Sequence, residues 1–464
     1  MQTLKPVRVT KDLPGPRSAA ALARQGLVES NARTYPRHLP LAVSKATGSW
    51  ITDLDGNEYL DFLSGAGVLA LGHNHPEVIE AIRVQLDQVI HTLDLPTEKK
   101  EEFTTSVLDL LPADIRGNYK VHFCGPTGAD AVEAAMKLCK SHTGRGNVVT
   151  FQGGYHGSTA GAMSVTGAVA PKKRVTGLVP GVHFFPYGYC HQCPLGLNRS
   201  HCDTNCAAYL ARALDDPMGG LTQPAAILME VVQGEGGSIP APVEFVESVA
   251  ATAKKHGVPL IVDEIQSGIG RTGRWFAFEH YGVEPDVILL SKALGGAGLP
   301  VSVMLYRREL DDWLPGSHIG TFRGNNLAFA AGVAALRLMH RDGVLNNVER
   351  RGYYILQMLA EVANDLHIVA DVRGLGLMIG VELCDPADEV APRVLARRVQ
   401  RLALERGLIV ELGGRDDSVI RLPPPLNLTH DEACAGMEAL TDALREADFE
   451  RTGSAVSGNP CAEG

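Results

Sequence analysis

Two ionisable side chains stand at the ends of apolar runs, and they are the residues of this chain best placed to do chemistry. Lys292 follows the run 285–291, and Asp263 ends the run that begins at Pro259. If both runs are strands of an open α/β sheet, the two side chains lie at the carboxyl ends, where such sheets bind ligands. An amine and a carboxylate in this arrangement suit pyridoxal 5′-phosphate, because the lysine can form a Schiff base and the acid can keep the ring nitrogen protonated. The alternative is a strand-end lysine that reaches solvent beside a structural Asp-Glu pair.

A segment of small residues offers a place for a phosphate group. Residues 125–130 read Gly-Pro-Thr-Gly-Ala-Asp, and they connect the apolar run 120–124 to a strong helix pattern. Small residues at a helix N-terminus let backbone N–H groups approach an anion, which the helix dipole also favours. We therefore expect Thr127, Gly128 and Ala129 to bind phosphate. The alternative is an ordinary helix start in which Thr127 and Asp130 form a local capping pair.

A second glycine-rich segment matches the dinucleotide-binding pattern G-x-G-x-x-G. It runs from Gly268 to Gly273, but Arg-Trp-Phe-Ala-Phe-Glu follows it in place of a clean helix start. The acidic residue expected about twenty positions further on, at a strand end, is also missing. We interpret this segment as a glycine-rich loop beside the site and do not expect a nicotinamide nucleotide.

The elements that must position these residues alternate between strand and helix patterns. Seven short apolar segments are expected to be strands: 120–124, 147–151, 181–185, 225–231, 258–263, 286–291 and 301–306. Helix patterns cover 76–93 and 98–111, and a long helical region covers 323–365. This order predicts an α/β protein with a large, doubly wound, mainly parallel sheet.

The two ends of the chain predict a smaller α+β domain. A hairpin signature surrounds Asp55-Gly56, and residues 366–382 and 407–422 read as strands flanking a helix at 389–406. A helix at 429–447 closes the domain. The expected division is an N-terminal arm with part of the small domain (1–75), a large domain (76–345), the rest of the small domain (346–450) and a disordered tail (451–464).

Composition excludes several classes of function. The chain has 464 residues, a formal net charge of −10 and 45% hydrophobic residues, which is typical of a globular protein. The acidic balance and the lack of a basic stripe argue against nucleic-acid binding. We see no apolar stretch long enough to span a membrane and no signal-peptide core near Met1, so we expect no membrane partner and a cytoplasmic location.

Nine cysteines are present, and four of them cluster. Cys190, Cys193, Cys202 and Cys206 have spacing that could suit structural zinc. We favour a loop of reduced thiols near the catalytic entrance and no metal. The scattered cysteines are expected to be free thiols: Cys124, Cys139, Cys384, Cys434 and Cys461.

Together these pieces resemble the class III (subgroup II, ω-type) pyridoxal-phosphate-dependent aminotransferases. The resemblance rests on Asp61-Phe-Leu-Ser-Gly-Ala-Gly, Gly72-His-Asn-His-Pro, Thr127-Gly-Ala, Gly154-Tyr-His-Gly, Glu230-Val-Val-Gln-Gly-Glu-Gly-Gly, Asp263-Glu-Ile-Gln, Ser291-Lys-Ala-Leu and Gly320-Thr-Phe-Arg-Gly-Asn, in order over roughly residues 40–440. It implies fold type I, the aspartate aminotransferase-like fold. The segment 125–135 and Glu411-Leu-Gly-Gly-Arg are most similar to members that act on diaminobutyrate and 2-oxoglutarate.

The resemblance also implies cofactor-binding roles. Lys292 would bond to the cofactor and later move a proton, and Asp263 would pair with the ring nitrogen. The other implied contacts are Tyr155 stacked on one ring face, Val262 against the other, Gln266 on the ring hydroxyl, and Gly128 and Ala129 on the phosphate together with Thr321 from a partner subunit. A homodimer follows if Thr321 plays that part, and a tetramer stays open.

Substrate-binding roles follow from the same resemblance. Arg421 would clamp the α-carboxylate of glutamate or 2-oxoglutarate, and Glu235 would form a switchable pair with it. Glu230 is also expected on the substrate side. Arg33 and Arg37 could bind the carboxylate of the amino donor, or they could belong to a solvated arm. His73, His75 and His156 are expected to be structural or rim histidines.

The function implied is transfer of the terminal amino group of a diamino acid, L-2,4-diaminobutyrate, to 2-oxoglutarate. The products would be L-aspartate 4-semialdehyde and L-glutamate, and the partners are small molecules. Three alternatives stay open: an aminomutase or epimerase on the same scaffold, an aminotransferase for ornithine, lysine or 4-aminobutyrate, and a partner-binding protein with a catalytically dead fold.

Overall fold

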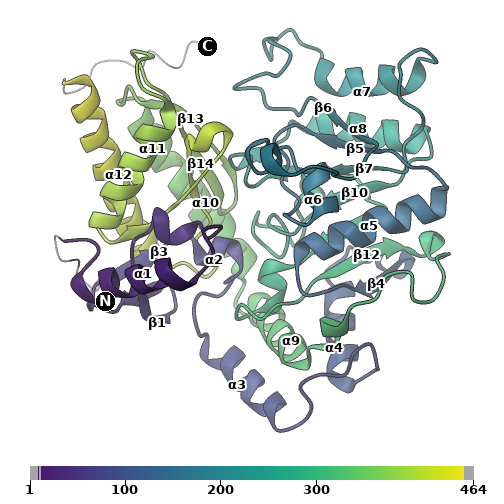
Figure 1. Ribbon diagram of the computed structural model, residues 1–464, viewed down its shortest axis with the longest axis horizontal. Helices are drawn as coiled ribbons and strands as arrows, with labels where there is room; N and C mark the ends of the chain where they lie inside the picture. Colours follow the sequence, from purple (N-terminus) through teal and green to yellow (C-terminus); the bar gives the residue numbers. More distant parts are fainter. Residues whose placement is uncertain (1–8, 10–11, 454–464) are drawn as a thin grey trace. The chain divides into compact units, whose positions relative to one another are not determined.

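The computed structural model describes residue 9 and residues 12–453, which divide into two compact units. Unit 1 takes the described residues up to Pro76 and from Asn346 onward, and unit 2 is Glu77–Leu345. The first boundary differs by one residue from the expected one, and the second coincides with it. Figure 1 labels the helices and strands of both units.

Unit 2 is built on a seven-stranded sheet. Its order is β4 (Tyr119–Phe123), β12 (Val303–Arg307), β11 (Val287–Leu290), β10 (Leu260–Asp263), β7 (Ala226–Met229), β5 (Val148–Phe151) and β6 (Val182–Phe185). β12 is antiparallel to both of its neighbours, whereas β11, β10, β7, β5 and β6 pair in parallel. The predicted large, mainly parallel sheet is confirmed, and each expected strand overlaps an observed one.

The central strands are apolar throughout because both faces of the sheet are covered. All four residues of β7, of β10 and of β11 are buried. Helix α5 (Gly128–Thr143) packs against them through small residues such as Ala131 and Ala135, which share a core with Leu228, Ile261 and Leu289. Small side chains let the helix approach the sheet closely, which fixes where α5 begins relative to the strand ends.

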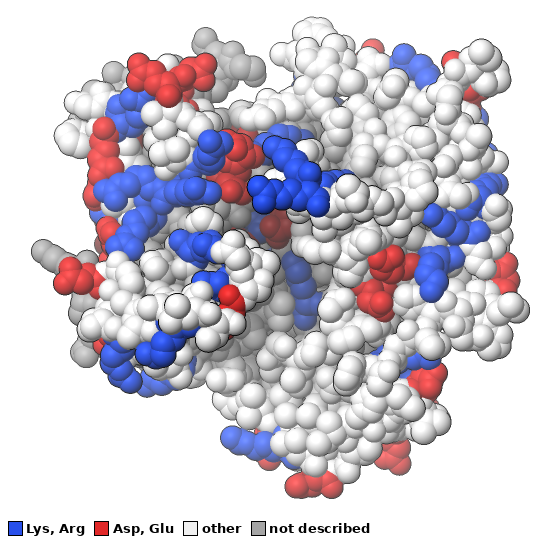
Figure 2. All heavy atoms as spheres, in the orientation of Figure 1, with Lys and Arg blue, Asp and Glu red and all other residues white. Residues whose placement is uncertain are grey.

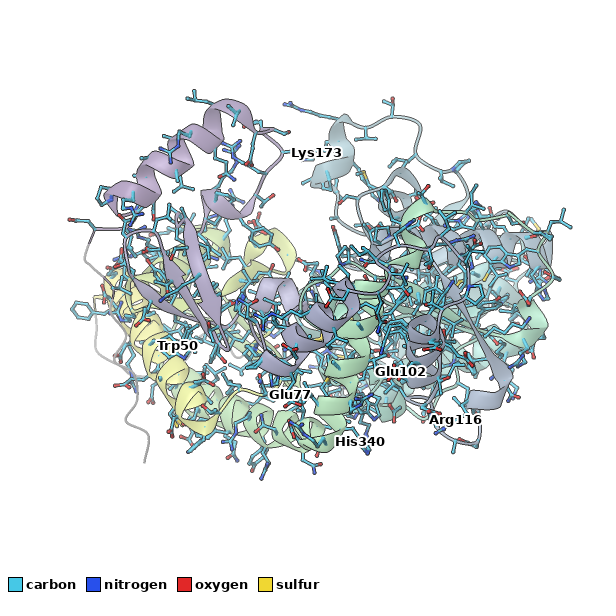
Figure 3. The ribbon with its side chains drawn as sticks, turned by 90° about the horizontal axis from the view of Figure 1, so that it is seen from below. Trp50, Glu77, Glu102, Arg116, Lys173 and His340 are labelled. Carbon is cyan, nitrogen blue, oxygen red and sulfur yellow. The ribbon has the colours of Figure 1, made fainter. Side chains whose placement is uncertain are left out.

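The remaining helices of unit 2 surround this sheet. They are α3 (Pro76–Leu86), α4 (Glu98–Leu108), α6 (Ala160–Val165), α7 (Asn205–Asp215), α8 (Val243–Lys255) and α9 (Asn326–Arg341). Glu77 of α3 accepts two hydrogen bonds from Arg341 at the end of α9, both at 2.9 Å; Glu77 and the neighbouring His340 are labelled in Figure 3. The predicted long helical region is two helices, because Gly343 has a φ of 61° and ends α9 before α10 (Val344–Ala363) begins.

Unit 1 contains two four-stranded sheets. The first has the order β1 (Val43–Thr47), β2 (Trp50–Asp53), β3 (Glu58–Asp61) and β15 (Leu408–Ile409). The second has the order β13 (Val369–Leu375), β14 (Met378–Leu383), β17 (Val419–Leu422) and β16 (Glu411–Gly413), and all its neighbours are antiparallel. The predicted hairpin, β2 and β3, is antiparallel, while β15 pairs with β3 in parallel.

Helices complete unit 1. They are α1 (Pro16–Val28), α11 (Pro392–Glu405), α12 (His430–Thr452) and all but the first turn of α10. Part of the predicted N-terminal arm is therefore helical. Asp55 fixes the start of α1, because its carboxylate accepts hydrogen bonds from the backbone N–H groups of Arg17 and Ser18 at 2.8 Å. Trp50, labelled in Figure 3, donates from Nε1 to Glu432 of α12 at 3.2 Å.

The predictions for the C-terminal tail and for Cys384 differ from the structure. The predicted tail from residue 451 is wrong for its first two residues, which continue α12; residues 454–464 lie outside the described part. Cys384 is disulfide-bonded, so the prediction of a free thiol there is wrong, since pairing depends on proximity in space and not on spacing in the sequence. Cys461 lies outside the described residues.

The face of the molecule drawn in Figure 2 carries side chains of both charges. Figure 2 shows basic and acidic side chains interspersed over the face drawn. Among the described residues, no helix is both long and apolar enough to cross a bilayer.

Candidate active site

A cavity of about 280 Å³ opens at the carboxyl ends of β10 and β11 in unit 2. The residues that line it are Gly128, Ala129, Tyr155, His156, Gly157, Ser158, Glu230, Glu235, Asp263, Ile265, Gln266, Ser291 and Lys292. The sequence predicted eight of these as site residues. The strand ends therefore bring together the chemistry that their residue types indicated.

Lys292 and Asp263 reach this cavity from neighbouring parallel strands. Asp263 is the last residue of β10 and lies opposite Leu289 of β11, so Lys292 follows three positions further along. Lys292 has a φ of 43°, a left-handed backbone that few non-glycine residues adopt. Such a conformation costs about 1–3 kcal/mol and is typical of functional sites. Ser291 helps to hold it, because its hydroxyl donates to the carbonyl of Val301 at 2.8 Å.

His156 fixes the carboxylate of Asp263. Its Nδ1 lies 2.8 Å from Oδ2 of Asp263, and both side chains are buried. Burial alone lowers the pKa of His156, but the hydrogen bond to Asp263 and the charges of Asp263 and Glu230 outweigh it and raise the pKa above its usual value. The backbone N–H of Ile265 donates to Oδ1 of Asp263 at 3.0 Å. Of the two alternatives expected for His156, structural or rim, the structure shows the structural one, because this buried histidine positions the carboxylate that faces the cavity.

Glu230 organises the loops around the cavity. Its two carboxylate oxygens accept the backbone N–H groups of Tyr155 at 2.9 Å and Gly234 at 3.0 Å. Burial raises the pKa of Glu230 to about 7. The carboxylate thus sets the place of Tyr155, whose ring lines the cavity. A direct contact between Glu230 and substrate stays a prediction.

The start of α5 has the features of a phosphate cradle. Gly128 and Ala129 line the cavity at the helix N-terminus, and a Cβ added to Gly128 would lie 2.7 Å from Cδ1 of Ile265. Thr127 is exposed, and its Oγ1 accepts the backbone N–H of Asp130 at 3.3 Å. Thr127 therefore caps α5, as the alternative interpretation expected. Gly128 and Ala129 are small, so they leave the helix N-terminus accessible to a phosphate group.

The apolar face of the cavity comes from Ile265 and not from Val262. Val262 is fully buried inside β10 and is not among the described residues that line the cavity. Successive strand residues point to opposite faces, so Val262 cannot share the direction of Asp263. The prediction for Val262 is wrong, and Ile265, two residues after Asp263, is the residue that sequence reasoning missed.

Glu235 and Gln266 face each other across the cavity wall. Nε2 of Gln266 lies 3.4 Å from Oε1 of Glu235. Gln266 is therefore positioned by a carboxylate, and its expected contact with a ring hydroxyl stays a prediction.

Arg421, in unit 1, has a partner that the sequence did not reveal. Its guanidinium lies 2.5 Å from Oε2 of Glu411, and both side chains are buried. The two residues are directly opposite each other in β17 and β16. The expected pair between Arg421 and Glu235 stays a prediction. The contact between Arg421 and Glu411 follows from the register of β16 and β17, and a sequence alone does not give that register.

Arg33 and Arg37 use their guanidinium groups locally. Arg33 donates to the carbonyls of Glu29 and Ser30 at 3.2 and 2.8 Å, and Arg37 donates to the carbonyls of Arg33 and Asn31 at 3.1 and 3.0 Å. These bonds shape the segment that follows α1. Substrate binding by either arginine stays a prediction. His73 is structural, because its Nε2 lies 2.8 Å from Asp61.

The four clustered cysteines are free thiols that line one small cavity with Tyr187, Tyr189 and Arg199. Burial raises the pKa of Cys206 to about 11 and that of Cys190 above its usual value, so both thiols hold their protons at neutral pH. Within the described part of the chain, no group of three or more histidine, cysteine or acidic side chains is arranged to hold a metal ion.

Comparison with known proteins decides the family. The family model for "Aminotransferase class-III" matches residues 31–444. The chain belongs to the class III aminotransferases. Two relatives named diaminobutyrate–2-oxoglutarate aminotransferase illustrate the similarity. The one from Rhizobium meliloti (strain 1021) is 48% identical, covering 94% of this chain and 93% of its own; the one from Haemophilus influenzae is 45% identical, covering 89% and 92%.

Solved structures share the fold of this class III aminotransferase. An ornithine aminotransferase from Toxoplasma gondii is 27% identical with a TM-score of 0.80, covering 95% of this chain and 97% of that one. A pyridoxal-phosphate-bound amine transaminase from an uncultivated Pseudomonas species is also 27% identical with a TM-score of 0.80, covering 90% and 98%. The expected fold type I architecture is confirmed.

The cofactor of this class III aminotransferase is pyridoxal 5′-phosphate, and the cavity suits it. An amine, a fixed carboxylate, an aromatic ring and a helix N-terminus without bulky side chains are the groups that the cofactor's aldehyde, ring nitrogen, ring face and phosphate require. Four residues that line the same cavity supply these groups: Lys292, Asp263, Tyr155 and Gly128.

Proposed function

We propose that this aminotransferase transfers the terminal amino group of L-2,4-diaminobutyrate to 2-oxoglutarate, giving L-aspartate 4-semialdehyde and L-glutamate. The observation that carries the reaction type is the convergence of Lys292, Asp263 and Gln266 on one cavity. The names of relatives at 48% and 45% identity support the choice of substrates.

The chain's own residues divide the work at the reacting carbon. When bound, the cofactor supplies an electron sink for that carbon. Lys292 would hold the cofactor through its amine, and the same amine, once free, would move the proton at the reacting carbon. The carboxylate of Asp263 would hold the ring nitrogen. His156 keeps that carboxylate oriented, since it donates to Oδ2 from a buried position.

The walls of the cavity restrict the geometry of that proton transfer. Tyr155 and Ile265 offer an aromatic and an aliphatic surface for the two faces of a flat ring. Gly128 and Ala129 offer backbone N–H groups to a phosphate at the other end. Fixing a ring at both ends leaves the reacting carbon within reach of one base, Lys292, which is how positioning lowers the barrier.

We also propose a homodimer. Two segments of unit 2 lie together, because Nε2 of His91 is 2.7 Å from the carbonyl of Thr321 and the rings of His91 and Phe322 are 6.0 Å apart. They expose a set of large apolar side chains: Val84, Leu86, Ile90, Leu93, Leu95, Ile319 and Phe322. A second copy covering this surface would bury it. Thr321 is exposed and is not among the described residues that line the cavity, which suits a role in the partner's phosphate site.

Sedimentation of wild type and Phe322→Glu tests the homodimer. The charge should shift the wild-type dimer toward monomer and weaken cofactor binding with it. A wild type that sediments as a monomer while it holds the cofactor would contradict the proposal. A cytoplasmic location stays a prediction from the sequence.

Steady-state kinetics with a substrate panel test the reaction. Two half-reactions that share one cofactor require parallel double-reciprocal plots for diaminobutyrate and 2-oxoglutarate. Product formed without 2-oxoglutarate in excess of one equivalent per enzyme would instead support an aminomutase or epimerase. Because a methylene is worth only about 1–3 kcal/mol in a pocket, ornithine, lysine and 4-aminobutyrate belong in the panel, and diaminobutyrate should have the highest kcat/KM.

A further inference from the structure

We propose that Cys190 and Cys193 form a modification site, a dithiol that a hydroperoxide oxidises to a disulfide. The site lies in unit 2, in the loop that joins β6 to α7 (Figure 1). It lies outside the catalytic cavity, because neither cysteine is among the described residues that line that cavity. The substrate class is a small peroxide, and a thiol reductant would reverse the modification.

A turn brings the two thiols of this site together. His191 and Gln192 form the turn, with Cys190 before it and Cys193 after it. The ends of a four-residue turn lie within about 7 Å of each other, measured between Cα atoms, and a disulfide needs about 4.4–6.8 Å. Two intervening residues are also the spacing of dithiols that cycle between reduced and oxidised forms. The backbone therefore allows a disulfide here without a large rearrangement.

The loop gathers further thiols around the same pair. Cys190 and Cys193 line one small cavity together with Cys202 and Cys206, and all four are free thiols. The thiol of Cys202 donates to the carbonyl of Arg199 at 3.7 Å, which folds the loop back on itself. Because no group of three or more histidine, cysteine or acidic side chains in the described chain is arranged to hold a metal ion, the cavity favours pairing between thiols.

Arg199 favours the reactive form of Cys190. The thiolate, and not the thiol, is the nucleophile. Burial raises the pKa of Cys190, and the guanidinium of Arg199 opposes that rise. Glu244 of α8 holds Arg199 in place, since its two carboxylate oxygens accept from the guanidinium at 3.1 and 2.9 Å. The net shift is upward, so we expect oxidation to be slow at neutral pH and to accelerate as pH rises.

The chemical step needs a peroxide and nothing else as oxidant. The sulfur of Cys190 attacks one peroxide oxygen, the O–O bond breaks, and the thiol proton goes to the departing oxygen, which leaves as water or an alcohol. The product is a sulfenic acid. The thiol of Cys193 then attacks that sulfur, so that the S–S bond forms, the S–O bond breaks and water leaves. Two thiols lose two electrons, and one peroxide gains them.

The side of the loop before Cys190 is anchored in the core. Tyr187 is fully buried, and its hydroxyl lies 3.1 Å from the carbonyl of Glu230. The next residue, Gly188, is closely packed, because an added Cβ would lie 2.7 Å from a proline side chain. Closing the disulfide should therefore move Cys193 and the residues after it, and transamination by the oxidised protein should stay within about twofold of the reduced rate.

Peroxide treatment followed by mass spectrometry tests the site. Reduced wild-type holoenzyme is treated with tert-butyl hydroperoxide, blocked with N-ethylmaleimide and digested. The peptide that contains Cys190 and Cys193 should lose two hydrogens and two alkylation sites, and dithiothreitol should restore them. Below the thiol pKa, the rate should rise about tenfold per pH unit. Cys193→Ser should form no disulfide and should keep a sulfenic acid on Cys190 that dimedone traps.

Three further variants provide controls. Cys434→Ser changes a free thiol of unit 1 and should leave the reaction at Cys190 unaltered. Arg199→Gln removes the nearby cation and should slow oxidation about two- to threefold. Arg337→Gln breaks another exposed arginine–glutamate pair of unit 2 and should not slow it.

Three results would overturn the inference. The first is oxidation of Cys434 while Cys190 and Cys193 stay open to alkylation. The second is one equivalent of zinc in the protein as purified, with the thiols of the cavity protected from N-ethylmaleimide. The third is a disulfide between Cys202 and Cys206 in place of the expected one. Loss of transamination in step with disulfide formation would contradict the separation of this site from the catalytic cavity.

Discussion

Two buried charged side chains, Asp263 in unit 2 and Arg421 in unit 1, are compensated by different kinds of partner. The difference follows from the elements that bring each partner close. Asp263 in unit 2 is held by His156 and by the backbone of Ile265, both close to the same strand end. Arg421 in unit 1 is held by Glu411, whose position is set by strand register. The partners of Asp263 are a buried imidazole and a backbone N–H group, which hold the orientation of its carboxylate. The partner of Arg421 is a buried carboxylate that reaches it from the adjacent strand.

The chemistry around the two charges follows the same division. His156 is buried to 3% exposure and its pKa is raised, so it remains a hydrogen-bond donor to Asp263 over a wider pH range than a free histidine. Glu411 reaches Arg421 as a carboxylate that lies opposite it across two strands. The first side chain is thus held by an imidazole and a backbone N–H group, and the second by an oppositely charged side chain.

Lys292→Ala should have the largest effect on activity, and that effect should be confined to the unit 2 site. It removes the covalent attachment and the base at the reacting carbon, so transamination should fall about ten-thousandfold. The Arg421–Glu411 pair in unit 1 is not altered, so the thermal midpoint of the apo variant should equal that of the wild type. Absorbance and calorimetry on the same sample measure both. The control is Lys173→Ala, an exposed lysine labelled in Figure 3, which should retain full activity. Near-normal turnover by Lys292→Ala would remove the lysine from the mechanism.

Asp263→Asn tests whether the first charge must be fixed. The amide keeps the size of the side chain but loses the charge against the ring nitrogen, so kcat should fall about a hundred- to a thousandfold in both half-reactions. Glu411→Gln, in contrast, removes the charge that compensates buried Arg421, so it should lower the thermal midpoint. An Asp263→Asn variant with the wild-type kcat would contradict the role of this carboxylate.

His156→Gln should have a smaller effect, because it removes only the group that holds the carboxylate. Losing one hydrogen bond to a charged group predicts a fall in kcat of about ten- to a hundredfold. Asp263→Asn and the double variant should then be nearly equal in rate. Additive losses in the double variant would show that His156 acts separately from Asp263.

The same variant predicts a change in the pH dependence of stability. The folded pKa of His156 lies above its ordinary value of 6.5, so the stability that its pair with Asp263 contributes is fully present below pH 6.5. That contribution is lost as pH rises through the raised pKa. Thermal midpoints of apo wild type and His156→Gln, measured from pH 6 to 9, should therefore converge at high pH. A difference that grows with pH would contradict the assignment.

Gly128→Ala should have the smallest effect, and it tests whether the start of α5 limits the approach of the cofactor. The added Cβ would lie 2.7 Å from Cδ1 of Ile265, the far end of a flexible side chain, so cofactor affinity should weaken about fivefold. Ile265→Val removes that atom and should restore most of the affinity in the double variant. Equilibrium dialysis of the cofactor measures both. An unchanged affinity in Gly128→Ala would show that this wall does not limit the approach.

The sequence predicted which residues come together in unit 2 because they stand at strand ends. Apolar runs locate β10 and β11, and parallel strands bring their carboxyl ends to one edge, so Lys292 and Asp263 had to lie close together. The same reasoning located the start of α5. It failed for Val262 because the apolar residue that lines the cavity, Ile265, comes after the strand, where strand alternation no longer applies.

The partners of the two charges were harder to predict because each depends on a fold-level detail. His156 and Asp263 are 107 positions apart, and their contact requires the packing of the loop after β5 on β10. Glu411 meets Arg421 because the chain turns back between Gly413 and Val419 in one register; a shift of one residue would place Glu411 on the other face. Motif and periodicity contain neither piece of information.

The most direct test of the account is the absorbance spectrum of the purified holoenzyme as substrates are added singly. L-2,4-diaminobutyrate alone should abolish the visible band of the lysine-bound cofactor, and 2-oxoglutarate added afterwards should restore it. A band that persists with diaminobutyrate, and disappears with none of the amines in the panel, would contradict the assignment of this chain as a diaminobutyrate–2-oxoglutarate aminotransferase.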